Sequence, residues 1–322
     1  MENTSQGSHS EHIATRPIGV FDSGIGGLTV TRELAARLPQ ESIVYLGDTL
    51  RCPYGPRPLP EIRSFARQIA AWLACQQVKL IVIACNSATA AALEDIQRTS
   101  PVPVLGVIEP GARAAVQATT ARRVGVIGTQ ATIDSGVYTQ AIRSMDAGIT
   151  VFSTATPRFV EMVEQGLRLG DSFIEDITAE ASRVYIRPAF QEIARDYLNP
   201  LKRCGIDTLV LGCTHYPLLA PLISQIIGAQ VQIISSAEET ARDVAETLRR
   251  RGQLAPEGNQ PVYRFATTSP DLTDFAALGS AILSRSVPDP EYVPIEELQA
   301  LVAAYSAPAQ PQTLPLPSAL AS

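Results

Sequence analysis

Two cysteines stand at the ends of apolar runs and are the first candidates for chemistry in this chain. Cys85 follows the run 80–84 and Cys213 follows the run 208–212. Each run is typical of a buried strand, and each cysteine is followed by polar residues and then by a helical stretch. A thiol at the carboxyl end of a parallel strand, beside a helix N-terminus, lies where α/β folds bind ligands and stabilise thiolates. The pattern predicts two thiols that face one small molecule from opposite sides.

Polar side chains crowd around both cysteines. Asn86, Ser87 and Thr89 follow the first, and Thr214 and His215 follow the second. Packing alone does not require them at strand ends. His215 is one of three histidines, the other two being in the polar N-terminal segment, and it lies close enough to Cys213 in sequence to exchange a proton with it.

Several other interpretations compete with this one. Free cysteines are often simply buried, and we favour that for Cys52, Cys75 and Cys204. Zinc would need ligands such as Cys85, Cys213, His215 and Asp22, but no local ligand pair has the usual spacing, so we predict no metal. A cysteine hydrolase with His215 as base would leave one thiol without a role. Two bases on opposite faces of one carbon account for both thiols.

A glycine-rich turn follows the first predicted strand. In residues 22–29 (DSGIGGLT) the third glycine of a dinucleotide motif is replaced by Thr29, and Asp22 would repel a pyrophosphate. We therefore expect no nucleotide there. The turn is interpreted as letting the backbone approach a small ligand while Asp22 and Ser23 offer an anion and a hydroxyl; the alternative is that Asp22 is an ordinary helix N-cap.

Composition limits the class of protein. The 322 residues are 45% hydrophobic and carry a net charge of −6, which argues against nucleic acid or an anionic membrane as partner. Five scattered cysteines without a CxxC pair indicate reduced thiols and a cytoplasmic setting. No apolar run approaches the length of a membrane helix, and residues 1–15 are predicted to be a disordered leader rather than a signal peptide.

The elements that must position the thiols alternate between strand and helix, which predicts parallel βαβ units. Segments 17–23 and 123–129 look like two starts of one related unit, so an internal duplication with one thiol in each half is expected. We predict a discontinuous first α/β domain (16–108 plus 230–286), an inserted second α/β domain (109–229) and a largely disordered C-terminal extension (287–322).

The chain resembles the glutamate racemases of the cofactor-independent aspartate/glutamate racemase superfamily over roughly residues 16–270. The segments that carry the resemblance are 18–28 (IGVFDSGIGGL), 53–55 (PYG), 84–90 (ACNSATA), 159–166 (FVEMVEQG) and 211–217 (LGCTHYP). The resemblance implies two similar parallel-sheet α/β domains related by pseudo-twofold symmetry, with glutamate bound in the cleft between them. It also implies racemisation without a cofactor, supply of D-glutamate for peptidoglycan synthesis, and a homodimer as one oligomeric state.

The resemblance further assigns site residues. Cys85 and Cys213 match the catalytic bases, serving D- and L-glutamate respectively, and Asp22, Glu164 and His215 match their helpers. The predicted substrate-binding residues are Asp22, Ser23, Pro53, Tyr54, Gly55, Asn86, Ser87, Thr89, Thr129, Thr132, Thr214 and His215. Two departures stand out: Ser87 replaces the usual threonine, and Thr156 replaces a common cysteine.

Elementary chemistry agrees with the absence of pyridoxal phosphate. That cofactor needs a Schiff-base lysine, and the chain's only lysines, Lys79 and Lys202, precede predicted strands instead of following them. Two alternative functions stay open at this point. One is a racemase for aspartate or another amino acid, and the other is a non-catalytic binding or regulatory protein that keeps the fold.

Overall fold

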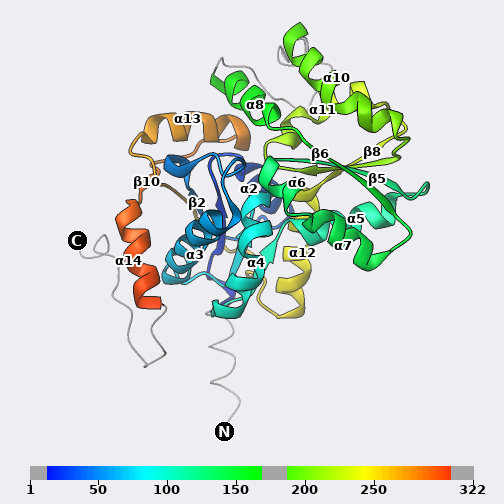
Figure 1. Cartoon of the computed structure of the whole chain (residues 1–322). Coiled ribbons are helices and arrows are strands. Elements are labelled where there is room, and N and C mark those ends of the chain that lie inside the picture. Colours follow the sequence, from blue (N-terminus) through cyan, green and yellow to red (C-terminus); the bar gives the residue numbers. More distant parts are fainter. Residues whose placement is uncertain (1–12, 169–186, 306–322) are drawn as a thin grey trace.

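Two parallel β-sheets organise the chain, each in its own α/β domain (Figure 1). The computed structural model describes residues 13–168 and 187–305. The first sheet has the order β10-β9-β2-β1-β3-β4 and consists of β1 (Ile18–Asp22), β2 (Ile43–Gly47), β3 (Leu80–Ile83), β4 (Val104–Gly106), β9 (Tyr263–Thr267) and β10 (Glu291–Tyr292). The second has the order β6-β5-β7-β8 and consists of β5 (Arg123–Gly128), β6 (Thr150–Ala155), β7 (Thr208–Gly212) and β8 (Gln232–Ser235).

The central strands are almost entirely apolar because helices cover both faces of each sheet. Strands β1, β2, β3 and β7 are buried at every position. The helices of the first domain are α2 (Leu28–Arg37), η1 (Thr49–Arg51), α3 (Leu59–Cys75), α4 (Asn86–Thr99), α13 (Leu272–Leu283) and α14 (Ile295–Tyr305). The other helices are α5 (Ile108–Ala118), α6 (Gln130–Asp134), α7 (Val137–Met145), α8 (Arg158–Arg168), α10 (Pro188–Arg203), η2 (Tyr216–Leu219), α11 (Ala220–Ile227) and α12 (Ser236–Arg250).

The two sheets repeat one strand order. In the first, β2-β1-β3-β4 lie side by side, and in the second β6-β5-β7-β8 do so with the same sequence order of strands. Strand β3 therefore corresponds to β7, and the cysteines that follow them hold equivalent places. The prediction of two similar parallel-sheet α/β domains is confirmed, and the shared order supports the predicted duplication.

Strand β8 corrects the predicted domain boundary. Residues from 230 onward were assigned to the first domain, but β8 pairs with β7 in the second sheet. As the fourth strand of its unit, β8 is the counterpart of β4. The chain returns to the first sheet only with β9, which pairs with β2.

Two helices cross between the domains. Helix α5 follows the first unit but packs against β7 and β8 of the second, whereas α12 follows the second unit and packs against α2 of the first. The two helices also pack against each other. Because each helix packs against the other domain, the two helices join the domains.

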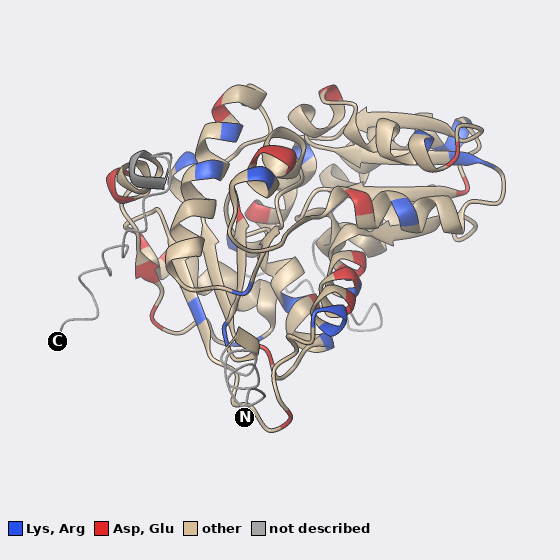
Figure 2. Cartoon of the chain, turned by 90° about the horizontal axis from the view of Figure 1, so that it is seen from below, with Lys and Arg blue, Asp and Glu red and all other residues tan. Residues whose placement is uncertain are grey.

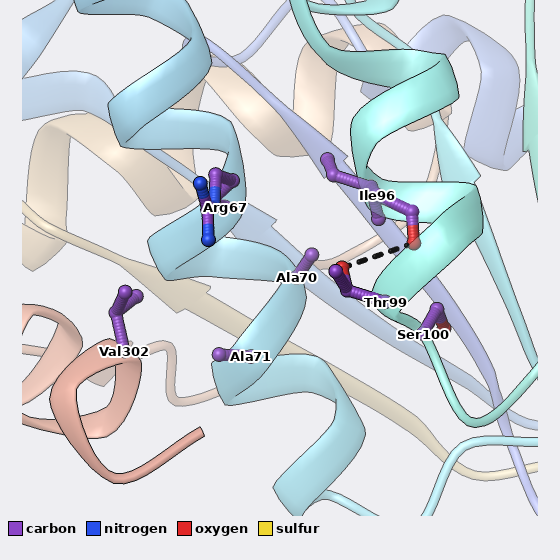
Figure 3. Close-up of a pocket in the computed structure, with 7 residues that line it drawn as sticks. All are labelled: Arg67, Ala70, Ala71, Ile96, Thr99, Ser100 and Val302. Carbon is purple, nitrogen blue, oxygen red and sulfur yellow. Dashed lines mark hydrogen bonds between the residues drawn. The ribbon is translucent and has the colours of Figure 1, made fainter. Parts of the chain in front are cut away.

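The C-terminal extension is ordered well beyond residue 287, contrary to the prediction. Strand β10 pairs with β9, and α14 packs against α3 with Val293 and Leu298 buried. Figure 3 shows Val302 of α14 facing α3 and α4 across a cavity of about 260 Å³. Burial of apolar side chains stabilises this segment, although its Pro- and Ala-rich composition did not indicate such burial. Residues 306–322 lie outside the described residues.

The leader prediction is also wrong in part. Residues 1–12 lie outside the described residues, but Ala14 is buried and its carbonyl accepts a hydrogen bond from Lys79 Nζ at 2.6 Å. Lys79 is itself buried and pairs with Glu41 at 2.5 Å. Its role is thus structural. None of the helices in residues 13–168 and 187–305 has the length and apolar character needed to cross a membrane.

Candidate active site

A cavity of about 390 Å³ lies where the carboxyl ends of both sheets meet, and both predicted catalytic thiols line it. The predicted residues that line the cavity come from both domains and are Ser23, Pro53, Tyr54, Gly55, Cys85, Asn86, Ser87, Thr129, Cys213, Thr214 and His215. This geometry agrees with the expectation that the two thiols face one small space.

Cys85 is the N-cap of α4. Its sulfur accepts a hydrogen bond from Ala88 N at 3.4 Å, and the residue is only 5% exposed. Burial, followed by the negative charge of Asp22, raises the pKa of the Cys85 thiol to about 12, although Ala88 N–H and the Ser23 hydroxyl act in the opposite direction. At neutral pH Cys85 is therefore a thiol that can donate a proton.

Cys213 has a different environment. Its sulfur lies 3.8 Å from Nδ1 of His215, whose Nε2 lies 3.4 Å from Glu164 Oε1. Burial lowers the pKa of His215, but the hydrogen bonds and charges of Cys213 and Glu164 outweigh it and raise the pKa to about 10. For Glu164 the directions are reversed: burial raises the pKa of the carboxyl, but its contacts with His215 bring the net pKa below the ordinary value. A protonated imidazole therefore stands between a carboxylate and the second sulfur.

Asp22 lies behind the cavity and does not line it. The carboxylate is fully buried; Oδ2 accepts from Gly24 N at 3.0 Å, and Oδ1 accepts from the Thr214 hydroxyl at 3.4 Å. Burial raises the pKa of Asp22, an effect that the nearby His215 charge partly offsets. Since α2 begins at Leu28 with Gly27 as its N-cap, the alternative that Asp22 caps this helix is wrong.

Gly26 of the glycine-rich turn approaches the other domain, whereas Ser23 of the same turn lines the cavity. A Cβ added to Gly26 would overlap Thr214 Oγ1 and lie 2.6 Å from His215 Nδ1. The predicted role of this turn is thus corrected at Gly26: its missing side chain makes room for the loop that carries Cys213. Thr29 Oγ1 strengthens the same contact by donating to Thr214 O at 2.9 Å.

A cluster of three hydroxyls closes the opposite side of the cleft. Ser87 Oγ lies 2.8 Å from Thr129 Oγ1 and 3.3 Å from Thr132 Oγ1, and the two threonine oxygens are 3.0 Å apart. Next to it, Ala131 N of the second domain donates to Gly55 O at 2.9 Å. These contacts join loops from the two domains. Ser87, which replaces the usual threonine, still provides a hydroxyl to this cluster.

Asn86 offers an unused donor to the cavity. Its Oδ1 accepts from the Tyr138 hydroxyl at 2.7 Å, which fixes the amide, while the buried Nδ2 has no hydrogen-bond partner among the described residues. An unpaired buried N–H group is costly, so Nδ2 is prepared for an acceptor such as a carboxylate.

Other predicted residues lie outside the cavity wall. Thr89 does not line it, since its hydroxyl donates to Ile83 O at 3.0 Å and so tightens the start of α4. Thr132 contacts the cavity-lining residues Ser87 and Thr129. Glu164 contacts the cavity-lining residue His215. Thr156, which replaces a common cysteine, donates its hydroxyl to Tyr216 OH at 2.9 Å behind Cys213.

Sequence reasoning missed part of the wall: Cys52, Pro56, Gln130, Pro157, Val160 and Glu161. Cys52, Pro56 and Gln130 flank residues that were predicted, so adjacency was a usable signal. Val160 and Glu161 lie in segment 159–166, which already carried the resemblance, so that motif was a usable signal as well. Cys52, interpreted above as a buried structural thiol, in fact faces the cavity. Within the part of the chain that the structure describes, no group of three or more His, Cys, Asp or Glu side chains could hold a metal ion.

Comparison with known proteins identifies the family. Residues 18–244 match the model of the Asp/Glu/Hydantoin racemase family. The chain belongs to this family. It is 47% identical over 253 residues to a glutamate racemase of Bacillus cereus, an alignment that covers 79% of this chain and 88% of that relative.

Solved structures agree with this assignment and with the fold. Glutamate racemase isoform RacE1 from Bacillus anthracis superposes with a TM-score of 0.78 at 41% identity, covering 86% of this chain and 97% of that one. Glutamate racemase from Francisella tularensis, solved in complex with D-glutamate, gives a TM-score of 0.77 at 34% identity, covering 88% of this chain and 99% of that one. The resemblance predicted from the motifs is confirmed.

Proposed function

We propose that this protein is a glutamate racemase that interconverts L- and D-glutamate without a cofactor. The observation that carries the proposal is that Cys85 and Cys213, at equivalent positions of the two repeated units, line one cavity. The Francisella relative binds D-glutamate, which gives the substrate class. A non-catalytic protein would have no use for two such thiols, each with its own proton-handling neighbours.

The mechanism follows from the unequal surroundings of the thiols. Cα of an amino acid is a very weak acid, so the site must supply a base on one face and an acid on the other, and must stabilise the carbanion between them. Cys213, as thiolate beside the His215 imidazolium, takes the proton from Cα of L-glutamate and becomes a thiol. The Cys85 thiol gives its proton to the opposite face and becomes a thiolate. The reverse reaction starts from D-glutamate with the roles exchanged.

Backbone N–H groups and polar side chains hold the two carboxylates of glutamate in this proposal. Ser23, Ser87, Thr214 and Asn86 all line the cavity, and the free Nδ2 of Asn86 is the clearest available donor. Asp22 attracts the α-ammonium through its negative charge from behind Ser23 and Thr214. Tyr54 and Gly55 complete the wall.

The first test is circular dichroism of the purified protein with L-glutamate and no added cofactor. The signal should decay to zero, and the product should acquire solvent deuterium at Cα. Matched reactions with L-aspartate test the alternative substrate, because turnover of aspartate in preference to glutamate would reassign the specificity. Absence of turnover with every amino acid would favour a binding or regulatory protein.

The second test separates the two thiols. Cys85→Ala and Cys213→Ala should each abolish inversion in both directions, because a missing acid blocks turnover as fully as a missing base. Each variant should still deprotonate one enantiomer of a glutamate analogue that carries a leaving group on Cβ, and should expel that group. The enantiomer that reacts assigns the surviving thiol to a face. Inversion in a single turnover by either variant would reject the two-thiol mechanism.

The cellular setting of the proposal is the cytoplasm, where D-glutamate is supplied for peptidoglycan synthesis. Deleting the gene in its organism should make growth depend on added D-glutamate. The homodimer stays a prediction, which analytical ultracentrifugation tests directly.

A further inference from the structure

We propose that Asp48, which does not line the cavity, is a positioning residue that holds the 52–56 wall of the active site in place through Tyr54. The wall consists of residues 52–56, all of which line the cavity. It belongs to no helix or strand, since it lies between η1 and α3. Something other than a backbone ladder must therefore hold it.

Asp48 supplies that support. It follows β2 directly, is completely buried, and its backbone N–H donates to Asp22 O at 3.0 Å. Its carboxylate accepts hydrogen bonds from three side chains: Thr268 Oγ1 at 2.8 Å, Arg51 Nε at 2.7 Å and the Tyr54 hydroxyl. A buried carboxylate with a cation and two hydroxyl donors is a strong, directional anchor, and removal of one partner is costly.

The same anchor docks the wall onto α3. The Arg51 guanidinium, besides binding Asp48, donates to Gln68 Oε1 at 2.6 Å and lies 4.1 Å from the centre of the Phe65 ring. The Tyr54 ring packs on Phe65 with centroids 5.6 Å apart. Asp48 thus ties the wall at once to β2, to the loop after β9 and to α3.

This arrangement defines what Tyr54 offers to a substrate. Its hydroxyl is already bonded to Asp48 and is therefore not a free donor for a substrate. The adjacent Gly55 O accepts from Ala131 N, and a Cβ on Gly55 would lie 3.0 Å from Thr129 Cβ. A shift of the wall therefore reaches the hydroxyl cluster of Ser87, Thr129 and Thr132 on the second domain.

The kinetic test rests on the proposed function and uses Asp48→Asn, Tyr54→Phe and the double variant in the full chain. Because the wall contacts substrate before and during reaction, KM for glutamate should rise about ten-fold in each single variant, with a smaller fall in kcat. The effects on KM in the double variant should be less than additive, because Asp48→Asn and Tyr54→Phe both act on the Asp48–Tyr54 hydrogen bond. Thr268→Val, a milder change on the remote side of Asp48, should raise KM in the same direction.

A second measurement does not depend on activity. Cys52 lies within the wall, whereas Cys75 and Cys204 are also partly exposed but lie elsewhere. Alkylation by iodoacetamide, followed by mass spectrometry, should be faster at Cys52 in Asp48→Asn while the rates at Cys75 and Cys204 stay unchanged. Thr240→Val, which removes a buried hydroxyl bonded to Ser236 O in α12, is the control and should change neither KM nor Cys52 labelling.

The outcomes distinguish this proposal from the proposed function. A wild-type protein inactive on glutamate would reject the function, and Cys52 labelling would still test the anchor. Unchanged Cys52 labelling in Asp48→Asn, uniform acceleration at all three cysteines, or additive effects of the two single variants on KM would overturn the positioning role.

Discussion

His215 makes the electrostatic surroundings of the two thiols unequal. Its ring lies between the sulfur of Cys213 and the carboxylate of Glu164, and its pKa of about 10 keeps it protonated at neutral pH. Cys85 lies beside the negative charge of Asp22 instead, and it is a thiol under the same conditions because its pKa is about 12. The site thus holds an acid, Cys85, on one side and a protonated imidazole, His215, beside the other thiol.

The raised pKa of His215 predicts a pH-dependent stability difference between wild type and His215→Asn. A group whose pKa rises from 6.5 to about 10 on folding stabilises the folded state fully below pH 6.5, and this contribution is lost as pH rises toward 10. The free energy of unfolding, measured in urea across that range, should therefore differ most at the acidic end, on the order of a few kcal/mol. Glu164→Gln removes the anionic partner of His215 and should lower its pKa in the folded state. The pH range over which this stabilisation is lost should therefore become narrower. A difference that grows with pH would contradict the assigned charge.

At the scale of elements, the glycine-rich turn before α2 fits against the loop after β7. Gly26→Ala would place a methyl group against Thr214 Oγ1 and His215, so the turn or the catalytic loop must move. We expect a loss of stability of about 1–3 kcal/mol together with a fall in kcat. Gly111→Ala in α5 is the matched control: its nearest neighbour lies at 3.4 Å, and alanine favours a helix. Wild-type kcat in Gly26→Ala would show that the loop tolerates displacement.

Strand β10 and helix α14 predict a second effect at this scale. A chain that ends at residue 290 loses the buried side chains of Val293 and Leu298, whereas a chain that ends at Tyr305 keeps the whole helix. Each buried aliphatic side chain contributes about 1.5–3 kcal/mol, so the shorter chain should unfold at a clearly lower temperature than the longer one. Equal midpoints in differential scanning calorimetry would contradict an integral role for α14.

The elements also show what the sequence could and could not predict. The thiol strands β3 and β7 were predictable because continuous apolar runs followed by polar donors are a local signal. The sheet to which β8 belongs was not, since pairing with β7 rather than with the first domain is decided by tertiary contacts. The wall residues Val160 and Glu161 lie in the motif 159–166, but its local pattern predicts only a helix, and the tertiary packing of α8 decides which of its residues line the cavity.

At the scale of the whole molecule, one of the buried apolar clusters spans both domains. One cluster of buried apolar residues contains Ile18 and Val20 of the first sheet together with Leu209 and Leu211 of the second. The exchanged helices α5 and α12 add an ion pair between Arg113 and Asp243. Figure 2 shows acidic and basic segments interspersed along the described helices, without separation by sign. Burial of apolar side chains therefore couples the domains.

This shared core predicts that the domains unfold together. Proteins of two domains often unfold in separate steps, but here neither sheet can be exposed without opening the cluster that contains both. Calorimetry should therefore give a single transition. Saturating D-glutamate, which binds only when both halves of the cleft are present, should raise that one midpoint by a few degrees at about 100 times Kd. Cys85→Ala, which keeps the wall but lacks a thiol, is the control and should show the same shift, because binding does not require inversion. Two resolved transitions, or a ligand shift confined to one of them, would show that the domains are stabilised independently.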